Sequence, residues 1–200
     1  MVATSYPRSE DDWQGLFIRR MADALAERAA IDLSLWAPDG PCHRDVTYAG
    51  EVDRDFLQQL SDSGGIAHLM RTRPLAGAAK GVTLLRRLRR LYRAQADSTD
   101  IFHINWLQNA LPLMGLGQKA VITVLGTDFK LLNLPGMVAA VRRVFQGNQC
   151  ILAPNANWMV PRLESLFGDL AEVRPVNFGI DERWFQLTTP SPTNRVHWLC

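Results

Sequence analysis

Short apolar runs that suit β-strands alternate along the chain with stretches of helical periodicity. The clearest run, residues 120–125, is apolar and rich in β-branched residues, as in a strand that is covered on both faces. In residues 16–28 the apolar positions, among them Leu16 and Met21, recur at helical spacing. This alternation predicts an α/β fold with a doubly wound, mostly parallel, Rossmann-like sheet.

The remaining elements follow from the same pattern. Further strands are expected at residues 1–5, 31–37, 46–50, 100–105, 150–153 and 172–176. Further helices are expected at residues 55–60, 77–95, 106–116, 137–146 and 158–167. The chain of 200 residues is long enough for one large domain with a real core, and it contains no internal repeat or low-complexity tract.

Polar residues follow the strands at the points where the strands are expected to end. Gly126, Thr127 and Asp128 come directly after residues 120–125, and Asn105 and Trp106 close the strand before it. Ligands of open α/β sheets bind outside the carboxyl ends of the strands, so these side chains are candidates for a binding site. A structural alternative exists for two of them: Asp128 would cap a turn or the next helix, and Trp106 would pack beneath a helix.

Three other positions also allow either a ligand contact or a purely structural role. Asn155 follows the strand at 150–153 and either contacts a ligand or makes a turn. His103 lies inside a strand, a position that favours a buried and hydrogen-bonded histidine over a ligand contact. Gly15 precedes the first helix, where backbone N–H groups can hold a phosphate, but a single glycine is a weak signal.

Charge is distributed unevenly. Between Arg71 and Arg93 lie seven Arg and one Lys with no acidic residue, although the whole chain has a net charge of only +2. The helix expected here is amphipathic, with a leucine stripe and a basic face. Such a helix either lies on an anionic membrane surface or packs its leucines on the sheet and leaves a solvated basic face. We expect no nucleic-acid partner, because no aromatic residues or known binding motif accompany the charge.

Composition narrows the class of protein further. No apolar run approaches the roughly 20 residues that span a bilayer, and no signal peptide is expected at the N-terminus. Cys42, Cys150 and Cys200 are odd in number and contain no Cys-x-x-Cys pair, so we expect reduced thiols without zinc or disulfide. We therefore predict a cytoplasmic protein without metal or cofactor, and consider peripheral binding to the inner membrane face.

The ordered motifs resemble the N-terminal half of a retaining, family-four glycosyltransferase with the GT-B fold. The motifs are Thr4-Ser-Tyr-Pro-Arg8 leading to Gly15-Leu-Phe, Asp100-Ile-Phe-His103, Ile122-Thr-Val-Leu-Gly-Thr-Asp128, and Val176-Asn-Phe-Gly-Ile-Asp181 with Phe185 after it. The resemblance covers essentially the whole chain. It implies that the complete protein transfers a sugar from a nucleotide-sugar donor to an acceptor hydroxyl, with a carbohydrate or lipid-linked acceptor.

The resemblance also assigns roles to residues. It implies that Gly126, Thr127, Asp128, His103, Asn105, Trp106 and Asn155 face the acceptor or transferred sugar, and that Gly15 lies near the donor phosphates. One departure affects catalysis: Leu125 stands where the family commonly has a histidine. No catalytic residue is therefore assigned, and a non-catalytic partner or sugar-binding module is the alternative function.

Composition also suggests a domain boundary near the C-terminus. We expect residues 1–187 to form the acceptor-side domain and residues 188–200 to contain a linker, rich in Pro, Ser and Thr, and one strand of a further nucleotide-sugar-binding domain. Because the resemblance places donor and acceptor in two different domains, we expect residues 1–200 alone to fold without transferring sugar.

Overall fold

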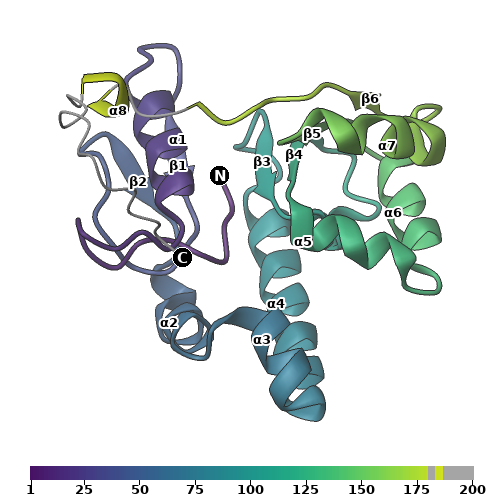
Figure 1. The fold of residues 1–200 in the computed structure, drawn as a ribbon, viewed down its shortest axis with the longest axis horizontal. Coiled ribbons are helices and arrows are strands. Elements are labelled where there is room, and N and C mark those ends of the chain that lie inside the picture. Colours follow the sequence, from purple (N-terminus) through teal and green to yellow (C-terminus); the bar gives the residue numbers. More distant parts are fainter. Residues whose placement is uncertain (180–182, 187–200) are drawn as a thin grey trace, which may run out of the picture.

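The computed structural model describes residues 1–179 and 183–186 and shows an α/β chain with parallel strands (Figure 1). One sheet has the order β3 (Phe102–Asn105), β4 (Lys119–Val124), β5 (Gln149–Pro154) and β6 (Glu172–Val173). A second, two-stranded sheet pairs β1 (Leu33–Leu35) with β2 (Val46–Tyr48). The predicted doubly wound, Rossmann-like fold is confirmed, with β4 in the interior of its sheet.

The N-terminal segment joins the two sheets. Val2 forms parallel bridges to Trp36, just after β1, and to Ile104 in β3. Its N–H donates to the carbonyl of His103 at 2.8 Å, and its carbonyl accepts the N–H of Asn105 at 3.0 Å. The spatial order is therefore β2, β1, the N-terminal segment, β3, β4, β5, β6. From the N-terminal segment the chain first winds toward β2 and then returns to β3, so the topological switch point lies between Val2 and β3.

The helices agree with the periodicity in most places. The α-helices are α1 (Leu16–Ala26), α2 (Arg54–Asp62), α3 (Gly65–Thr72), α4 (Pro74–Ala94), α5 (Gly126–Phe129), α6 (Met137–Phe145), α7 (Val160–Phe167) and α8 (Arg183–Gln186). The 3₁₀-helices are η1 (Glu51–Asp53), η2 (Leu107–Leu113), η3 (Lys130–Asn133) and η4 (Asn157–Met159).

Two parts of the helix prediction were wrong. Helix α3 was not predicted, because it is short and none of its side chains is fully buried. The helix expected over residues 106–116 is a 3₁₀ segment that contains Pro112, a residue that cannot donate a helical hydrogen bond. Helix α4 also begins three residues earlier than expected, at Pro74, which is well suited to the first helical turn.

The two sheets, joined through Val2, have two common faces, and the side chains on each face belong to a separate hydrophobic core. On one face, Leu33 and Leu35 of β1 pack with Ile18 and Ala22 of α1. On the other face, Trp36 and the inward residues of β3, β4 and β5 pack with α2, α4, α6 and α7. Alternation along the strands explains this division, because successive residues of a strand point to opposite faces.

Several sequence predictions fall outside the described residues. These are the whole C-terminal linker and strand expected at 188–200, which include Cys200, and residues Ile180 and Asp181 of the last motif. Cys42 is an exposed free thiol and Cys150 a buried one. Within residues 1–179 and 183–186 no helix is long and apolar enough to cross a membrane.

Candidate functional site

A groove of about 520 Å³ opens at the carboxyl ends of the strands, at the switch point. It reaches Thr4 and Ser5 after the N-terminal segment, Trp106 after β3, and Thr127 after β4. The α3–α4 hairpin forms its opposite wall. The groove therefore lies where ligands of open α/β folds bind, between elements that are far apart in sequence.

The lining of the groove contains uncharged polar side chains, called here its polar part, and apolar or small side chains, called its apolar part. The polar part includes Thr4, Ser5, Gln108 and Thr127 after the strand ends, Gln14 before α1 and Ser61 in α2. The apolar part includes Ile66, Ala67, Met70, Ala78, Val82 and Leu85 of the hairpin, and Leu111, Leu131 and Met137 of η2, η3 and α6. No charged residue is among the described residues that line it.

Trp106 occupies the strand end nearest the switch point and has an unusual backbone. Its φ of 68° and ψ of 125° make it the one described residue other than glycine with positive φ. A bulky side chain in this region is strained by on the order of 1–3 kcal/mol and persists only where neighbouring structure enforces it. Such outliers concentrate at ligand-binding sites, which supports a functional reason for the position of Trp106.

Asp128 provides the contacts that enforce this turn. Its Oδ2 accepts the N–H of Leu107 at 2.6 Å, and its Oδ1 accepts the N–H of Leu125 at 2.7 Å. One carboxylate therefore ties the residue after Trp106 to the end of β4. The bond to Leu125 also caps α5, because it satisfies a backbone donor at the helix N-terminus.

We call the two hydrogen bonds of the Asp128 carboxylate the Asp128 clamp, and burial shifts the pKa of its carboxyl. Asp128 is 2% exposed, and desolvation raises the pKa of its carboxyl to about 6, although the backbone N–H groups that it accepts oppose the shift. Asp128 does not line the groove. The structure thus places it beneath the site, where it shapes the turn that carries Trp106.

Asn105 has a comparable supporting position. It is fully buried, and its Nδ2 donates to the carbonyl of Val2 at 3.2 Å, which fastens the N-terminal segment to β3. Asn109, one turn of η2 later, donates to the carbonyl of Asn105 at 2.8 Å. These amides hold the two strands that meet at the switch point.

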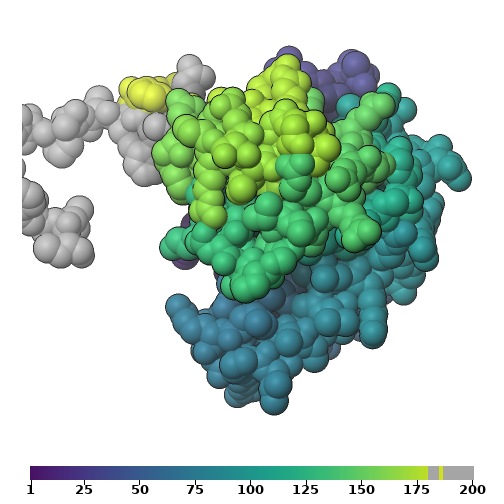
Figure 2. All heavy atoms as spheres, turned by 90° about the vertical axis from the view of Figure 1, so that its right-hand side faces the viewer, coloured from purple at the N-terminus to yellow at the C-terminus, as the bar shows by residue number. Residues whose placement is uncertain are grey.

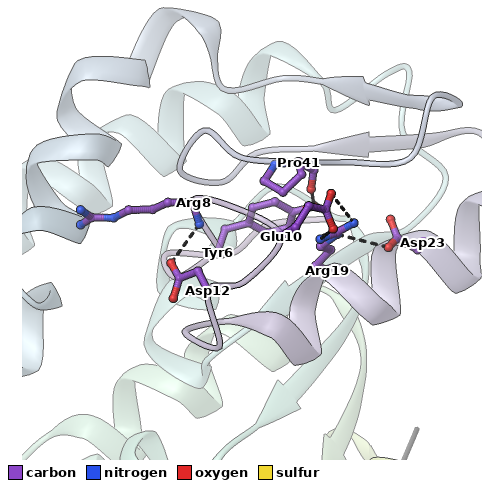
Figure 3. A network of polar contacts seen from close by, with 7 residues as sticks. All are labelled: Tyr6, Arg8, Glu10, Asp12, Arg19, Asp23 and Pro41. Atoms are coloured by element: carbon purple, nitrogen blue, oxygen red, sulfur yellow. Dashed lines mark hydrogen bonds and ion pairs between the residues drawn. The ribbon is translucent and has the colours of Figure 1, made fainter. Parts of the chain in front are cut away.

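The loop that links the N-terminal segment to α1 is held by its own polar contacts (Figure 3). Asp12 accepts the N–H groups of Arg8 at 3.0 Å and Gln14 at 2.9 Å, and these bonds lower the pKa of its carboxyl. Arg19 of α1 binds Glu10 through two hydrogen bonds of 2.6 and 3.0 Å. This loop therefore presents Gln14 to the groove in a defined position.

Gly15 is required by close packing in the same loop. It has a φ of 77°, and a Cβ there would lie 2.7 Å from the backbone nitrogen of Tyr6. Tyr6 is buried and donates its hydroxyl to the carbonyl of Pro41 at 3.0 Å. The glycine thus lets α1 begin directly against the N-terminal segment, and it does not itself line the groove.

The other predicted residues lie near this edge or inside the sheet. His103 is half-buried, with its Nε2 2.9 Å from Oγ1 of Thr123, and burial lowers the pKa of its imidazole to about 4. Leu125 is 7% exposed and belongs to the buried apolar residues. Asn155 donates its N–H to the carbonyl of Val124 at 3.1 Å, and its Oδ1 has no partner within the described part of the chain.

Of the predicted site residues, Trp106 and Thr127 are brought together in the groove, with Gly126 beside Thr127 in the chain. Sequence reasoning missed Gln108, Gln14 and Ser5. Gln108 is the most informative, because its Oε1 is buried without a hydrogen-bond partner among the described residues. Its position two residues after Trp106 was the available signal, but the helix expected there gave no reason to single it out.

A second hollow beside the loop is less suited to a ligand. Arg8, Glu10 and Asp39 line it, and Arg8 is already paired with Asp62 at 2.8 Å. Acidic side chains in its wall disfavour an anion. Elsewhere, the described residues contain no group of three or more His, Cys, Asp or Glu side chains that could hold a metal ion.

Comparisons with known proteins leave the site to be interpreted from its geometry alone. No family model matches the chain, and neither a curated protein nor a solved structure is detectably similar to it.

Proposed function

We propose that this chain is the acceptor-side domain of a glycosyltransferase that transfers a sugar from a nucleotide-sugar donor to an acceptor hydroxyl. The observation that carries the proposal is the uncharged, two-part groove at the topological switch point. The order of the motifs noted in the sequence supports this assignment, because Thr127 belongs to one of them and Trp106 lies three residues after another.

The absence of charge in the lining decides which substrate this groove suits. A nucleoside diphosphate would require basic side chains or several convergent N–H groups, whereas hydroxyl groups are recognised by uncharged amides and hydroxyls. Gln108, Gln14, Ser5 and Thr127 supply such groups in the groove that Trp106 also lines. The groove therefore suits the acceptor, and the donor would be held by a separate nucleotide-binding domain.

The apolar part favours a lipid-linked acceptor over a plain carbohydrate. Met70, Val82 and Leu85 lie on the hairpin side of the groove, away from the strand ends. Burial of an alkyl chain there is favourable by roughly 0.8 kcal/mol for each CH₂ group, while hydroxyls at the polar part gain little over water. An acceptor with a polar head and an apolar chain would use both parts.

In the proposed reaction the acceptor oxygen forms a bond to the anomeric carbon as that carbon's bond to the diphosphate breaks. The hydroxyl proton passes to the departing diphosphate, and the anomeric configuration is retained. The transition state is oxocarbenium-like, so stabilising the leaving diphosphate is the main electrostatic task. No charged residue is among the described residues that line the groove, so in this proposal the donor-binding domain performs that task.

Leu125 favours a second candidate, a non-catalytic sugar-binding module. Where the resembling family has a polar histidine, this chain has a buried leucine that contributes to the core. Both candidates require acceptor binding, so a binding experiment tests the groove and a turnover assay separates the candidates.

Binding can be followed by tryptophan fluorescence with octyl β-glucoside below its critical micelle concentration. We expect saturable, millimolar binding with a spectral change that disappears in Trp106→Phe. The change should persist in Trp13→Phe, because Trp13 is 83% exposed and lies outside the lining. Gln108→Leu should weaken binding about threefold to tenfold, as for loss of one hydrogen bond. Binding that is unchanged in both Trp106→Phe and Gln108→Leu would refute the proposed acceptor site.

A further inference from the structure

The eight cations between Arg71 and Arg93 do not form one continuous basic face. Arg87 and Arg90 bind the carboxylate of Asp53, which is 4% exposed. Arg89 donates to the carbonyls of Pro112 at 2.7 Å and Met114 at 2.6 Å. Three of the five arginines in the second half of α4 therefore make internal contacts, while Leu84 and Leu88 pack in the core as the leucine stripe predicted.

The end of the α3–α4 hairpin has a different character. Arg71 and Arg73 are exposed there, and neither forms an ion pair with an acidic side chain in the described chain. Leu75 is 89% exposed and Met70 is 47% exposed. No acidic residue occurs anywhere from residue 63 to residue 96. We call residues 70–76 the hairpin tip.

The hairpin tip is also well placed to meet a surface. In Figure 1 the hairpin extends below the sheets, and in Figure 2 the blue part of the chain, with α2 and α3, forms the lower lobe of the molecule. The hairpin is tightly packed, since a Cβ on Gly77 would lie 2.7 Å from the backbone nitrogen of Met70. The N-terminus of α4 lies within the tip, without an acidic residue in its first turn, and adds to the positive potential.

We propose that the hairpin tip docks into the interface of an anionic lipid bilayer. Leu75 and Met70 would enter the boundary between headgroups and acyl chains, while Arg71 and Arg73 bind anionic headgroups. The charges favour this partner because basic and apolar side chains share one projecting end, as in interfacial membrane anchors. Met70 also lines the groove, so the groove begins beside the proposed membrane contact. The inference stands on the hairpin tip and does not depend on the proposed sugar transfer.

The test is sedimentation of the purified chain with vesicles of phosphatidylcholine alone, or with an equal share of phosphatidylglycerol. We expect binding to the anionic vesicles only, and a decrease with salt as the Debye length falls from about 10 Å at 0.1 M to about 3 Å at 1 M. Arg71→Gln/Arg73→Gln should bind about twenty-five-fold more weakly, from a roughly fivefold effect of each cation. Leu75→Asn should weaken binding about tenfold by removing the inserted side chain.

The matched control is Arg28→Gln/Arg44→Gln, which removes the same charge from exposed positions away from the hairpin. It should bind like the unmodified chain. Circular dichroism should be unchanged in every variant, because all the substituted side chains are exposed. Equal binding to both vesicle types would overturn the proposal. So would a control that loses as much binding as Arg71→Gln/Arg73→Gln, or a Leu75→Asn variant that binds normally.

Discussion

The Oδ2 atom of Asp128 accepts the backbone N–H of Leu107 at 2.6 Å and so holds the turn after β3 against the end of β4. Through this bond a residue of one motif holds the turn that follows the strand of another motif. Trp106, immediately before Leu107, has positive φ and lines the groove. The clamp thus connects fold stability to the geometry of the candidate site.

Removing this clamp should destabilise the protein. Asp128→Ala leaves the N–H groups of Leu107 and Leu125 buried without their acceptor, so we expect the free energy of unfolding to fall by about 2–4 kcal/mol. Urea denaturation measures the change. Asp169→Ala is the matched control: Asp169 is 59% exposed and paired with Arg142, so its loss should cost less than about 1 kcal/mol. Equal losses in the two variants would contradict the clamp.

Substitution of Gly15 by alanine should lower the free energy of unfolding in two ways, through a steric clash and through backbone strain. Gly15→Ala places a Cβ 2.7 Å from the nitrogen of Tyr6 in addition to straining a φ of 77°. Gly115→Ala has a similar φ of 70° but no atom within 4 Å, so it should show the strain alone, about 1–2 kcal/mol. We expect thermal or urea unfolding to show a clearly larger loss for Gly15→Ala. A loss no greater than that of Gly115→Ala would mean that the loop moves away at little cost.

The imidazole of His103 should make stability depend on pH. Its pKa falls from an ordinary 6.5 to about 4 in the folded protein, chiefly because burial disfavours the charged form. Between pH 4 and pH 6.5 the imidazole is therefore protonated in the unfolded chain but not in the folded one. Its contribution to the free energy of unfolding is fully present above pH 6.5 and is lost as the pH falls toward 4. The slope is at most about 1.4 kcal/mol for each pH unit.

The measurement is urea unfolding from pH 4 to 7, compared between the unmodified chain and His103→Gln. The comparison is needed because the raised pKa of Asp128 contributes the opposite slope, a stability present at low pH that is lost as the pH rises through about 6. We expect the stability difference between the two proteins to grow with pH across this range. A constant difference would show that His103 titrates normally in the folded chain.

Asp53 should contribute more to the free energy of unfolding than either of the two arginines that it binds. It accepts hydrogen bonds from Arg87, from Arg90 at 2.6 Å and from the indole of Trp36 at 3.1 Å. Asp53→Ala leaves the indole N–H without its partner and separates both cations, which should cost about 2–3 kcal/mol in urea unfolding. Arg90→Gln should cost less than about 1 kcal/mol, because Arg90 is 58% exposed and Arg87 remains. The reverse order of effects would be inconsistent with this network.

The isolated 200-residue chain should bind an acceptor without transferring sugar. Proximity of donor and acceptor lowers a barrier by several kcal/mol, and the described groove has no cation for a nucleotide diphosphate. A turnover assay with a panel of nucleotide sugars and octyl β-glucoside tests this. Multiple turnover by residues 1–200, abolished by Trp106→Ala, would show that one domain is sufficient for transfer.

By itself, the sequence determined the fold class and most of its elements. Strands such as β4 are short β-branched runs, and α1 carries its apolar residues at helical spacing, so local pattern and burial agree. The polar residues after these strands also pointed to the edge of the sheet at which the groove opens. Parallel strands end at the same edge, and this follows from topology without knowledge of any side-chain contact.

Only the tertiary structure decided which of those residues lie in the groove. Asp128 and Trp106 both follow strand ends in the sequence. Asp128 nevertheless lies buried, with its carboxylate accepting backbone N–H groups, whereas Trp106 lines the groove. The basic segment was divided in the same way: Asp53, which is distant in sequence, binds Arg87 and Arg90, whereas Arg71 and Arg73 are exposed. Whether a polar side chain is satisfied internally depends on partners far away in the chain, and spacing along the sequence carries no record of them.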